Sequence, residues 1–429
     1  MPIFRFQTQA GQRIVVNARR ESTVVFQDGD TSYTFDYDGR LIGAFLGGRN
    51  YRRGLANEIL EKQGGPRPGV FGRVRRLLTR AEVQKLEEEA YGFTSRLSGE
   101  LDLNNGGPGS GDGQAGAYQA AIQALARVQT YDYARLERER EVYHRLYRPV
   151  TILPPDQYLA VYLQATEGCL YNRCRFCGFY RDRPFRLKSP DEFRRHITDV
   201  RAFLGGGMTL RRSIFLGDAN ALMIPQVDLV PMLRAVQDEF EILPARLEPD
   251  ARGQWKREHP GYLDGIYSFV DAVPARRKTP DEFAELARLG LRRVYVGLES
   301  GDAALLRFLG KPNTPADVIE LVRDVKTAGV AVGLVILVGP GGKRFEEAHI
   351  RETAGLLNAL ALDSGDLIYF SEVVDYPGST YGQRVESERI PSLSPGEIND
   401  QIDRLRARLS FPDPERAPRI SYYDIRLFI

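Results

Sequence analysis

The chain has 429 residues, of which 42% are hydrophobic and 27% charged, and this balance excludes a disordered or collagen-like protein. Its 59 basic and 57 acidic residues leave a formal charge of +2, which does not indicate a nucleic-acid-binding protein. There are only three cysteines, an odd and small number that excludes a disulfide scaffold and indicates a reducing compartment. The longest apolar run, residues 328–338, is too short to span a membrane, and the first residues lack the pattern of a signal peptide. We therefore expect a soluble, cytoplasmic protein.

The first 50 residues are rich in β-prone side chains. Asp28-Gly29-Asp30 separates two β-prone runs, and Asp38-Gly39 follows the second of them. Asp-Gly between such runs is typical of a β-hairpin. A capping box, Thr79-Arg80-Ala81-Glu82, then predicts a helix that ends near Leu97. Residues 1–97 are thus predicted to form a β-rich region followed by a helix.

A glycine-rich stretch follows. Residues 98–117 include Asn104-Asn105-Gly106-Gly107-Pro108-Gly109-Ser110-Gly111, a composition typical of a flexible linker. The next segment is charged and has no helix breaker before Pro149, so residues 118–150 are predicted to form a helical connector with one helix over residues 118–147.

Beyond residue 157 the pattern alternates between strands and helices. Several of the helices are expected to begin with a hydroxyl residue, then proline, then an acid at the third helical position, at Ser189, Thr279, Thr314 and Ser394. Apolar strands that alternate with capped helices indicate a parallel sheet. We therefore predict an α/β fold in which residues 151–385 form a partial (β/α)6 TIM-like barrel, with a C-terminal extension over residues 386–429. The six predicted strands are residues 158–164, 213–216, 266–273, 293–298, 330–338 and 367–373.

All three cysteines, Cys169, Cys174 and Cys177, lie in one nine-residue window just after the first predicted strand of the barrel. Three thiolates on one loop form a soft metal site. A structural zinc ion would need a fourth ligand, and none of the four histidines stands at zinc-finger spacing from Cys177. The pattern favours an iron–sulfur cluster over zinc or over unpaired core cysteines. Three ligands for a four-iron cluster leave one iron open to a small molecule.

The segment of residues 168–180, with its Cys-x4-Cys-x2-Cys spacing, resembles the cluster loop of the radical S-adenosylmethionine superfamily. The usual family spacing is Cys-x3-Cys-x2-Cys, so this chain has one extra residue. Val296-Gly297-Leu298-Glu299-Ser300-Gly301 and the glycines around residues 339–342 resemble the branch that contains oxygen-independent coproporphyrinogen oxidase. The resemblance covers roughly residues 158–381. It implies that the three cysteines bind a [4Fe–4S] cluster whose open iron holds S-adenosylmethionine.

The resemblance also implies the reaction. One electron from the cluster cleaves S-adenosylmethionine and gives a 5′-deoxyadenosyl radical, which abstracts a hydrogen atom from a substrate. A flavodoxin or ferredoxin is implied as the electron donor. The substrate, the product and the identity of any residue that acts on the substrate are not indicated.

Five further residues are candidates for binding S-adenosylmethionine, by their match to the family. Phe176 would pack beside the adenine, or else belong to the core of the loop. Gly217 and Asp218 would receive the methionine amine, or else form an ordinary turn after a strand. Glu299, and with it Ser300, would bind the ribose hydroxyls.

Two other interpretations of the protein, and the role of one segment, are kept open. One is a zinc-stabilised barrel that acts as a binding module without catalysis. Another is an RNA-modifying radical enzyme, although no RNA-binding appendix is recognisable in the sequence. The segment of residues 371–379, with Glu372 and Tyr376, ends the last predicted strand and is a candidate for contacts with the substrate or for simple capping.

Overall fold

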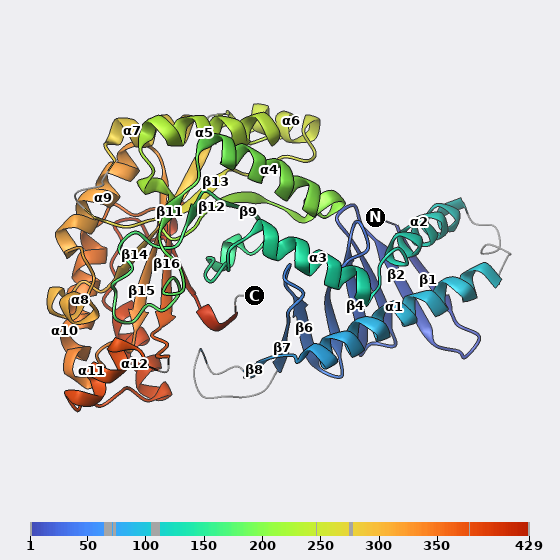
Figure 1. The fold of residues 1–429 in the computed structure, drawn as a ribbon, viewed down its shortest axis with the longest axis horizontal. Helices are drawn as coiled ribbons and strands as arrows, with labels where there is room; N and C mark the ends of the chain where they lie inside the picture. The colour runs from blue at the N-terminus through green and yellow to red at the C-terminus, as the bar shows by residue number, and fades with distance from the viewer. Residues whose placement is uncertain are drawn as a thin grey trace.

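The computed structural model describes residues 2–63, 71, 74–103, 112–245, 247–273, 278–376 and 378–427. An antiparallel sheet with its own helices occupies one end of the molecule, and a parallel sheet wrapped by helices occupies the other (Figure 1).

The N-terminal sheet is a meander, in which each strand pairs with the next along the chain. The predicted hairpins are confirmed, since Asp28-Gly29-Asp30 joins the third strand to the fourth and Asp38-Gly39 lies between the fourth and the fifth. The meander is longer than the sequence indicated. Within the described residues its strands are β1 (Ile3–Gln7), β2 (Arg13–Ala18), β3 (Ser22–Gln27), β4 (Thr31–Asp36), β5 (Leu41–Leu46), β6 (Arg49–Arg53), β7 (Ile59–Gln63) and β8 (Val74–Leu77).

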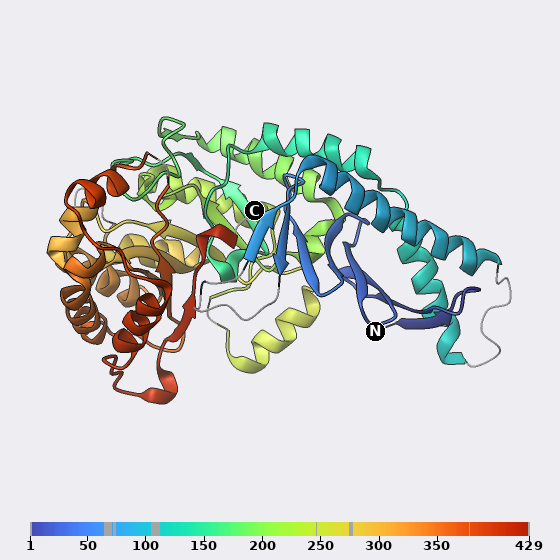
Figure 2. The ribbon, with the colours of Figure 1, turned by 90° about the horizontal axis from the view of Figure 1, so that it is seen from below.

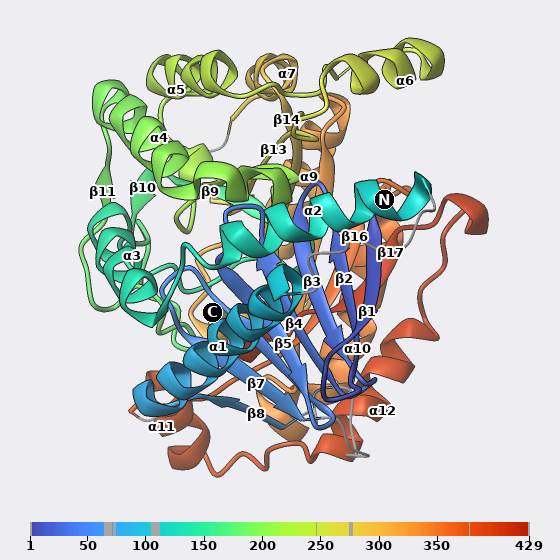
Figure 3. The same ribbon diagram turned by 90° about the vertical axis from the view of Figure 1, so that its right-hand side faces the viewer.

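Helices α1 (Arg80–Leu103) and α2 (Asp112–Val128) lie across one face of this sheet (Figure 3). Helix α1 continues beyond Leu97, the end expected from the sequence, and α2 begins before residue 118. The packing of Leu101 and Ala117 in the apolar cluster of this part accounts for the added turns, because burial of apolar side chains outweighs weak local propensity. The centre of the predicted linker, residues 104–111, lies outside the described residues.

The single helix predicted over residues 118–147 is wrong. Two helices occupy this stretch, α2 and α3 (Tyr133–Leu146), with a break at residues 129–132. The Asp132 side chain accepts a hydrogen bond from the backbone N–H of Arg135 and so caps the start of α3. A capping residue in the middle of a charged segment is the signal that would have placed this break.

The parallel sheet confirms the predicted barrel architecture. All six predicted strands form, and the sheet order is β17-β16-β15-β14-β13-β12-β9. The final strand, β17, was not predicted, because its four residues alternate between exposed and half-buried positions and give no apolar run. The strands are β9 (Ala160–Gln164), β12 (Ser213–Gly217), β13 (Ile266–Val270), β14 (Leu291–Glu299), β15 (Ala331–Val338), β16 (Leu367–Glu372) and β17 (Arg419–Tyr422).

Helices cover the outer side of the parallel sheet (Figure 1). The four predicted hydroxyl-proline-acid starts are confirmed, because Ser189, Thr279, Thr314 and Ser394 each form a complete capping box. These residues begin α4 (Pro190–Leu204), α7 (Pro280–Arg288), α9 (Pro315–Thr327) and α12 (Pro395–Arg406). The other helices of this part are α5 (Gln226–Glu239), α6 (Pro249–Glu258), α8 (Ala303–Leu309), α10 (Gly342–Ala359) and α11 (Thr380–Ser387).

Charged side chains join the N-terminal part of the molecule to the barrel. Arg40, next to β5, donates to the backbone carbonyl oxygens of Phe203 and Leu204 at the end of α4, at 3.1 Å each. Arg75 in β8 pairs with Asp424, which follows β17. The described residues that follow β17 accordingly lie between the barrel and the N-terminal sheet (Figures 1 and 2). None of the described helices combines the length and the apolar character needed to cross a membrane.

Candidate active site

The cysteine loop leaves the barrel at the carboxyl end of β9. Its base is closed by a short antiparallel pair, β10 (Thr166–Glu167) with β11 (Arg186–Leu187). Carboxyl ends of parallel strands are where barrel enzymes place their chemistry. All three cysteines are free thiols and line one cavity of about 410 Å³ at this end of the sheet.

Hydrogen bonds fix the backbone of the loop between the cysteines. Asn172 has a left-handed backbone, with φ of 44°, which asparagine tolerates better than most residues. Its backbone N–H lies 3.4 Å from the sulfur of Cys169, and its side chain donates to the carbonyl oxygen of Tyr180 at 2.7 Å. Arg181 donates to the carbonyl oxygen of Cys174 at 2.7 Å. The loop is therefore shaped by its own side chains.

The thiols are protonated in the absence of a metal. Burial raises the pKa of Cys174 to about 12 and the pKa of Cys177 to about 11. Metal binding requires thiolates, so loading this site must release protons to solvent.

A buried cation faces the cysteines across the cavity. Lys311 Nζ lies 3.4 Å from Asp271 Oδ1 and 3.6 Å from Glu299 Oε1, and all three residues line the cavity. Burial alone lowers the pKa of Lys311, but the charges of Asp271 and Glu299 raise it above its ordinary value, so the side chain is an ammonium. Both contacts are longer than a strong charge-assisted hydrogen bond, which leaves the ammonium able to bind an anionic group.

Glycine keeps the space beside this cation open. A Cβ atom at Gly297 would lie 2.5 Å from Glu299 Oε1 and 3.3 Å from Lys311 Nζ. Any larger residue at this position of β14 would fill the part of the cavity between the strand and the ion pair. Three thiols, a free volume and a buried ammonium therefore fit a cysteine-bound cluster with a ligand that carries a carboxylate.

The structure divides the predicted cofactor-binding residues into two groups. Phe176 and Glu299 line the cavity, as expected for residues that contact a bound molecule. Gly217, Asp218 and Ser300 are not among the described residues that line it. Ser300 instead bonds to His349 Nδ1 at 2.8 Å and accepts from the backbone N–H of Asp302 at 3.0 Å.

Asp218 is buried beneath the loop. Its carboxylate accepts hydrogen bonds from Tyr162, Gln164 and the backbone N–H of Gly168. Gly217 leaves room for the first of these bonds, because a Cβ atom there would lie 2.1 Å from the Tyr162 hydroxyl oxygen.

The cavity also contains residues that the sequence did not single out as site residues. Asp271 follows β13, and Lys311 follows α8. They are 40 residues apart, and only the barrel topology brings them together. In the segment of residues 371–379, a candidate for substrate contacts, Glu372 and Tyr376 both line the cavity. The Tyr376 hydroxyl lies 3.3 Å from the carbonyl oxygen of Cys177.

Within the described residues, no group of three or more His, Cys, Asp or Glu side chains is arranged to hold a single metal ion. A structural zinc ion requires its ligands to converge at about 2.0–2.3 Å from one centre. A four-iron cluster has no such requirement, since it takes each thiolate on a different iron.

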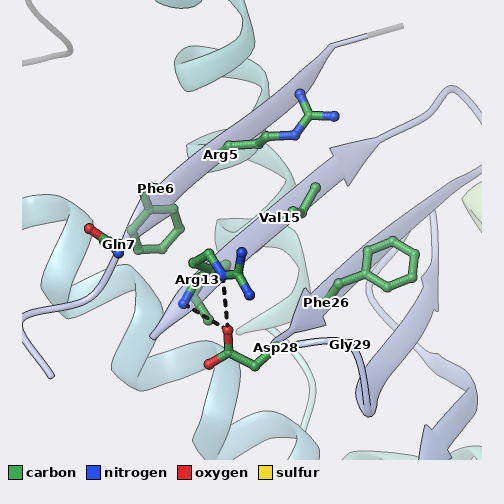
Figure 4. A pocket seen from close by; sticks show the side chains of 9 residues that line it. Arg5, Phe6, Gln7, Arg13, Val15, Phe26, Asp28 and Gly29 are labelled. Atoms are coloured by element: carbon green, nitrogen blue, oxygen red, sulfur yellow. Dashed lines mark hydrogen bonds and ion pairs between the residues drawn. The ribbon is translucent and has the colours of Figure 1, made fainter. Parts of the chain in front are cut away.

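A second hollow lies on the N-terminal sheet (Figure 4), and no cysteine is among the described residues that line it. It is lined by side chains of β1, β2 and β3 and by the turn after β3, and its acid Asp28 lies 3.5 Å from Arg13. Arg13 is 81% exposed, so this pair is screened by solvent. The described residues that line this hollow include no cysteine or histidine, and we place the candidate active site at the cysteine cavity.

The chain was also compared with known proteins. Residues 163–357 match the model of the Radical SAM superfamily, where SAM stands for S-adenosylmethionine. Residues 163–357 therefore form a radical SAM domain, and this family implies a [4Fe–4S] cluster and S-adenosylmethionine as cofactors. A search of curated proteins found no match.

Solved structures show weaker similarity. SuiB from Streptococcus suis is 13% identical, with a TM-score of 0.41 over 88% of this chain and 72% of SuiB. Coproporphyrinogen III oxidase from Escherichia coli is 13% identical, with a TM-score of 0.39 over 63% of this chain and 55% of the oxidase. The cobalamin-dependent radical enzyme OxsB is 17% identical, with a TM-score of 0.36. The match covers 57% of this chain and only 30% of OxsB. The family assignment thus depends on the match over residues 163–357.

Proposed function

We propose that this protein uses a [4Fe–4S] cluster held by Cys169, Cys174 and Cys177 to cleave S-adenosylmethionine reductively and to abstract hydrogen from a substrate. The observation that carries the proposal is the cavity itself, in which three thiols from one loop face a buried ammonium at the carboxyl end of a parallel barrel sheet. When bound, the cluster supplies the single electron that converts S-adenosylmethionine into methionine and a 5′-deoxyadenosyl radical.

The residues of this chain have separable tasks in the proposal. The cysteines bind three irons and leave one for the amine and carboxylate of S-adenosylmethionine. Lys311 pairs with that carboxylate, since it is a buried cation with only long contacts. Glu299 accepts hydrogen bonds from the ribose hydroxyls, and Phe176 packs against the adenine.

The remaining predicted residues act from outside the cavity. Ser300 holds the turn after β14 through its bonds to His349 and Asp302, and so keeps Glu299 directed at the cavity. Gly217 and Asp218 lie under the cysteine loop.

The proposal includes a partner and a location. A one-electron donor such as a flavodoxin or ferredoxin reduces the cluster, and the three unpaired thiols fit the reducing conditions of the cytoplasm. The aliphatic and aromatic side chains that complete the cavity, among them Phe269, Val373 and Ile425, exclude water from a reactive radical.

Metal content tests the proposal. The protein, reconstituted without oxygen, is expected to bind about four irons per chain and to be brown, and the Cys174→Ala variant is expected to lose the colour. A colourless wild-type protein with one zinc ion would overturn the proposal and favour a zinc-stabilised binding module.

A further inference from the structure

Asp218 lies at the base of the cysteine loop and is almost fully buried, with 1% of its surface exposed. It directly follows the strand β12, which neighbours β9, and its side chain contacts Gln164 of β9 and Gly168 at the start of the loop. Its Oδ1 atom accepts from the Tyr162 hydroxyl at 2.8 Å, and its Oδ2 atom accepts from the backbone N–H of Gly168 at 3.1 Å. Gly168 is the residue directly before Cys169.

Further contacts of the same carboxylate reach both ends of the loop. Gln164, the last residue of β9, donates to Oδ2 at 3.2 Å. Arg183, near the end of the loop, places Nη2 at 3.7 Å from Oδ2. The backbone N–H of Asp218 donates to the Thr166 hydroxyl at 2.7 Å. One side chain just after a neighbouring strand therefore connects the segment that enters the loop with the segment that leaves it.

The two ends of the loop are also in direct contact beside Asp218. Gly168 has φ of +77°, and a Cβ atom there would lie 3.0 Å from the carbonyl oxygen of Pro184. A left-handed residue without a side chain lets the chain turn from β10 directly toward Cys169. The N–H that this turn points inward is the one bound by Asp218.

The Asp218 carboxylate has little remaining capacity to bind a ligand. Both carboxylate oxygens accept hydrogen bonds from the protein, and the residue is not among the described residues that line the cavity. An amine from a cofactor would have to displace buried hydrogen bonds whose loss is costly.

We propose that Asp218 is a positioning residue, which fixes Cys169 through Gly168 and so sets the geometry and retention of the cluster, and that it does not contact the methionine amine. The inference rests on the proposed function, because it assumes that Cys169 binds an iron of the cluster. Residues behind metal ligands commonly control metal affinity by about 10–100-fold, through the orientation that they impose.

Two variants test the proposal against the direct-contact alternative. Asp218→Asn preserves the shape but replaces one accepting oxygen with a donor, and Tyr162→Phe removes one hydrogen bond to the carboxylate without changing its charge. For both we expect iron release to a chelator to be about tenfold faster than in the wild type, and an altered electron paramagnetic resonance spectrum of the reduced cluster. The affinity for S-adenosylmethionine per intact cluster should stay within about twofold of the wild type.

Asp366→Asn is the matched control. Asp366 is also a fully buried carboxylate of the barrel, bonded to Lys326 and to the backbone N–H of Val332, but it lies at the opposite ends of the strands from the cysteines. This variant is expected to unfold at a lower temperature and to keep the wild-type rate of iron release. It therefore separates general destabilisation from loss of the loop anchor.

The outcomes are distinct. Wild-type iron retention and spectrum in Asp218→Asn and Tyr162→Phe, with the affinity for S-adenosylmethionine reduced about tenfold or more, would overturn the proposal and assign Asp218 to the cofactor. Should Asp218→Asn not fold, Tyr162→Phe alone decides between the same two results. The iron content of the wild-type protein is measured first, before any variant is compared. A wild-type protein that binds no iron would overturn the proposed function and not this inference alone.

Discussion

Lys311 and Glu299 form an ion pair inside the cysteine cavity, with Nζ 3.6 Å from Oε1, although they come from the turn after α8 and the end of β14. The ammonium is only 5% exposed and is shared with Asp271. The ammonium is the one group of this triad that attracts an anion. The predictions for the cavity follow from this pair.

Replacement of Lys311 is expected to weaken cofactor binding. Lys311→Met removes the only cation of the triad, and a lost hydrogen bond to a charged group is worth about 1.5–3 kcal/mol, or roughly 10–150-fold in affinity. Equilibrium dialysis with labelled S-adenosylmethionine measures the change. Lys311→Arg keeps the charge and should recover most of the affinity, whereas equal affinities for Lys311→Met and the wild type would contradict the role of the ammonium.

Replacement of Glu299 is expected to affect the ribose contact. Glu299→Gln retains the shape of the side chain but not its charge, so we expect about tenfold weaker binding of S-adenosylmethionine. An analogue that lacks the ribose 2′-hydroxyl serves as the control ligand. The variant should bind this analogue nearly as well as the wild type does, and an equal loss for both ligands would show that Glu299 acts elsewhere.

The stability of the barrel is expected to fall at acidic pH. Burial lowers the pKa of His349 to about 4, and burial together with Lys188 lowers that of His196 to about 3. The unfolded chain binds a proton at each histidine below a pH of about 6.5, while the folded chain does so only at these lower values. The free energy of unfolding should therefore decrease as the pH falls from about 6.5 to 4, by about 3 kcal/mol for His349.

The His349→Gln variant checks this assignment. Glutamine can replace the hydrogen bonds to Ser300 and Leu337 without titrating. Thermal unfolding followed at several pH values should show a smaller pH dependence in the variant than in the wild type. Identical curves would mean that other groups cause the acid sensitivity.

Two glycine substitutions are expected to act in opposite directions. Gly301 follows Ser300, and a Cβ atom there would lie 2.3 Å from the backbone carbonyl oxygen of Glu352. Gly301→Ala should therefore destabilise the protein by about 1–3 kcal/mol. Gly355, in the middle of α10, has nothing within 4 Å of its Cβ position, so Gly355→Ala should stabilise by about 0.5–1 kcal/mol. Thermal unfolding compares them, and a stabilising Gly301→Ala would show that the turn has room to adjust.

The prediction of the fold succeeded where the signal was local and repeated. Capping boxes at Ser189 and Thr279 and apolar runs in the six long strands determined the barrel. Strand β17 was missed, because a four-residue half-exposed strand forms only through its pairing with β16. The break between α2 and α3 depends on Asp132 as a cap, and a single aspartate in a charged segment is a weak signal for one.

The candidate site was predictable only in part, for a related reason. The cysteines are close in sequence, and their spacing alone indicates a cluster. Asp271 and Lys311 give no such signal, since each is a single charged residue after an element and the pair exists only once the strands are aligned. Asp218 was recognised as important by its position, but its burial beneath Gly168 depends on the return of the loop and is visible only in three dimensions.

The central claim is that the three cysteines support the reductive cleavage of S-adenosylmethionine, and product formation tests it most directly. The reconstituted protein, incubated without oxygen with dithionite and S-adenosylmethionine, should release 5′-deoxyadenosine and methionine, detected by mass spectrometry, and the Cys169→Ala, Cys174→Ala and Cys177→Ala variants should release neither. A wild-type protein with about four irons per chain and an intact cluster spectrum that yields no 5′-deoxyadenosine would contradict the account.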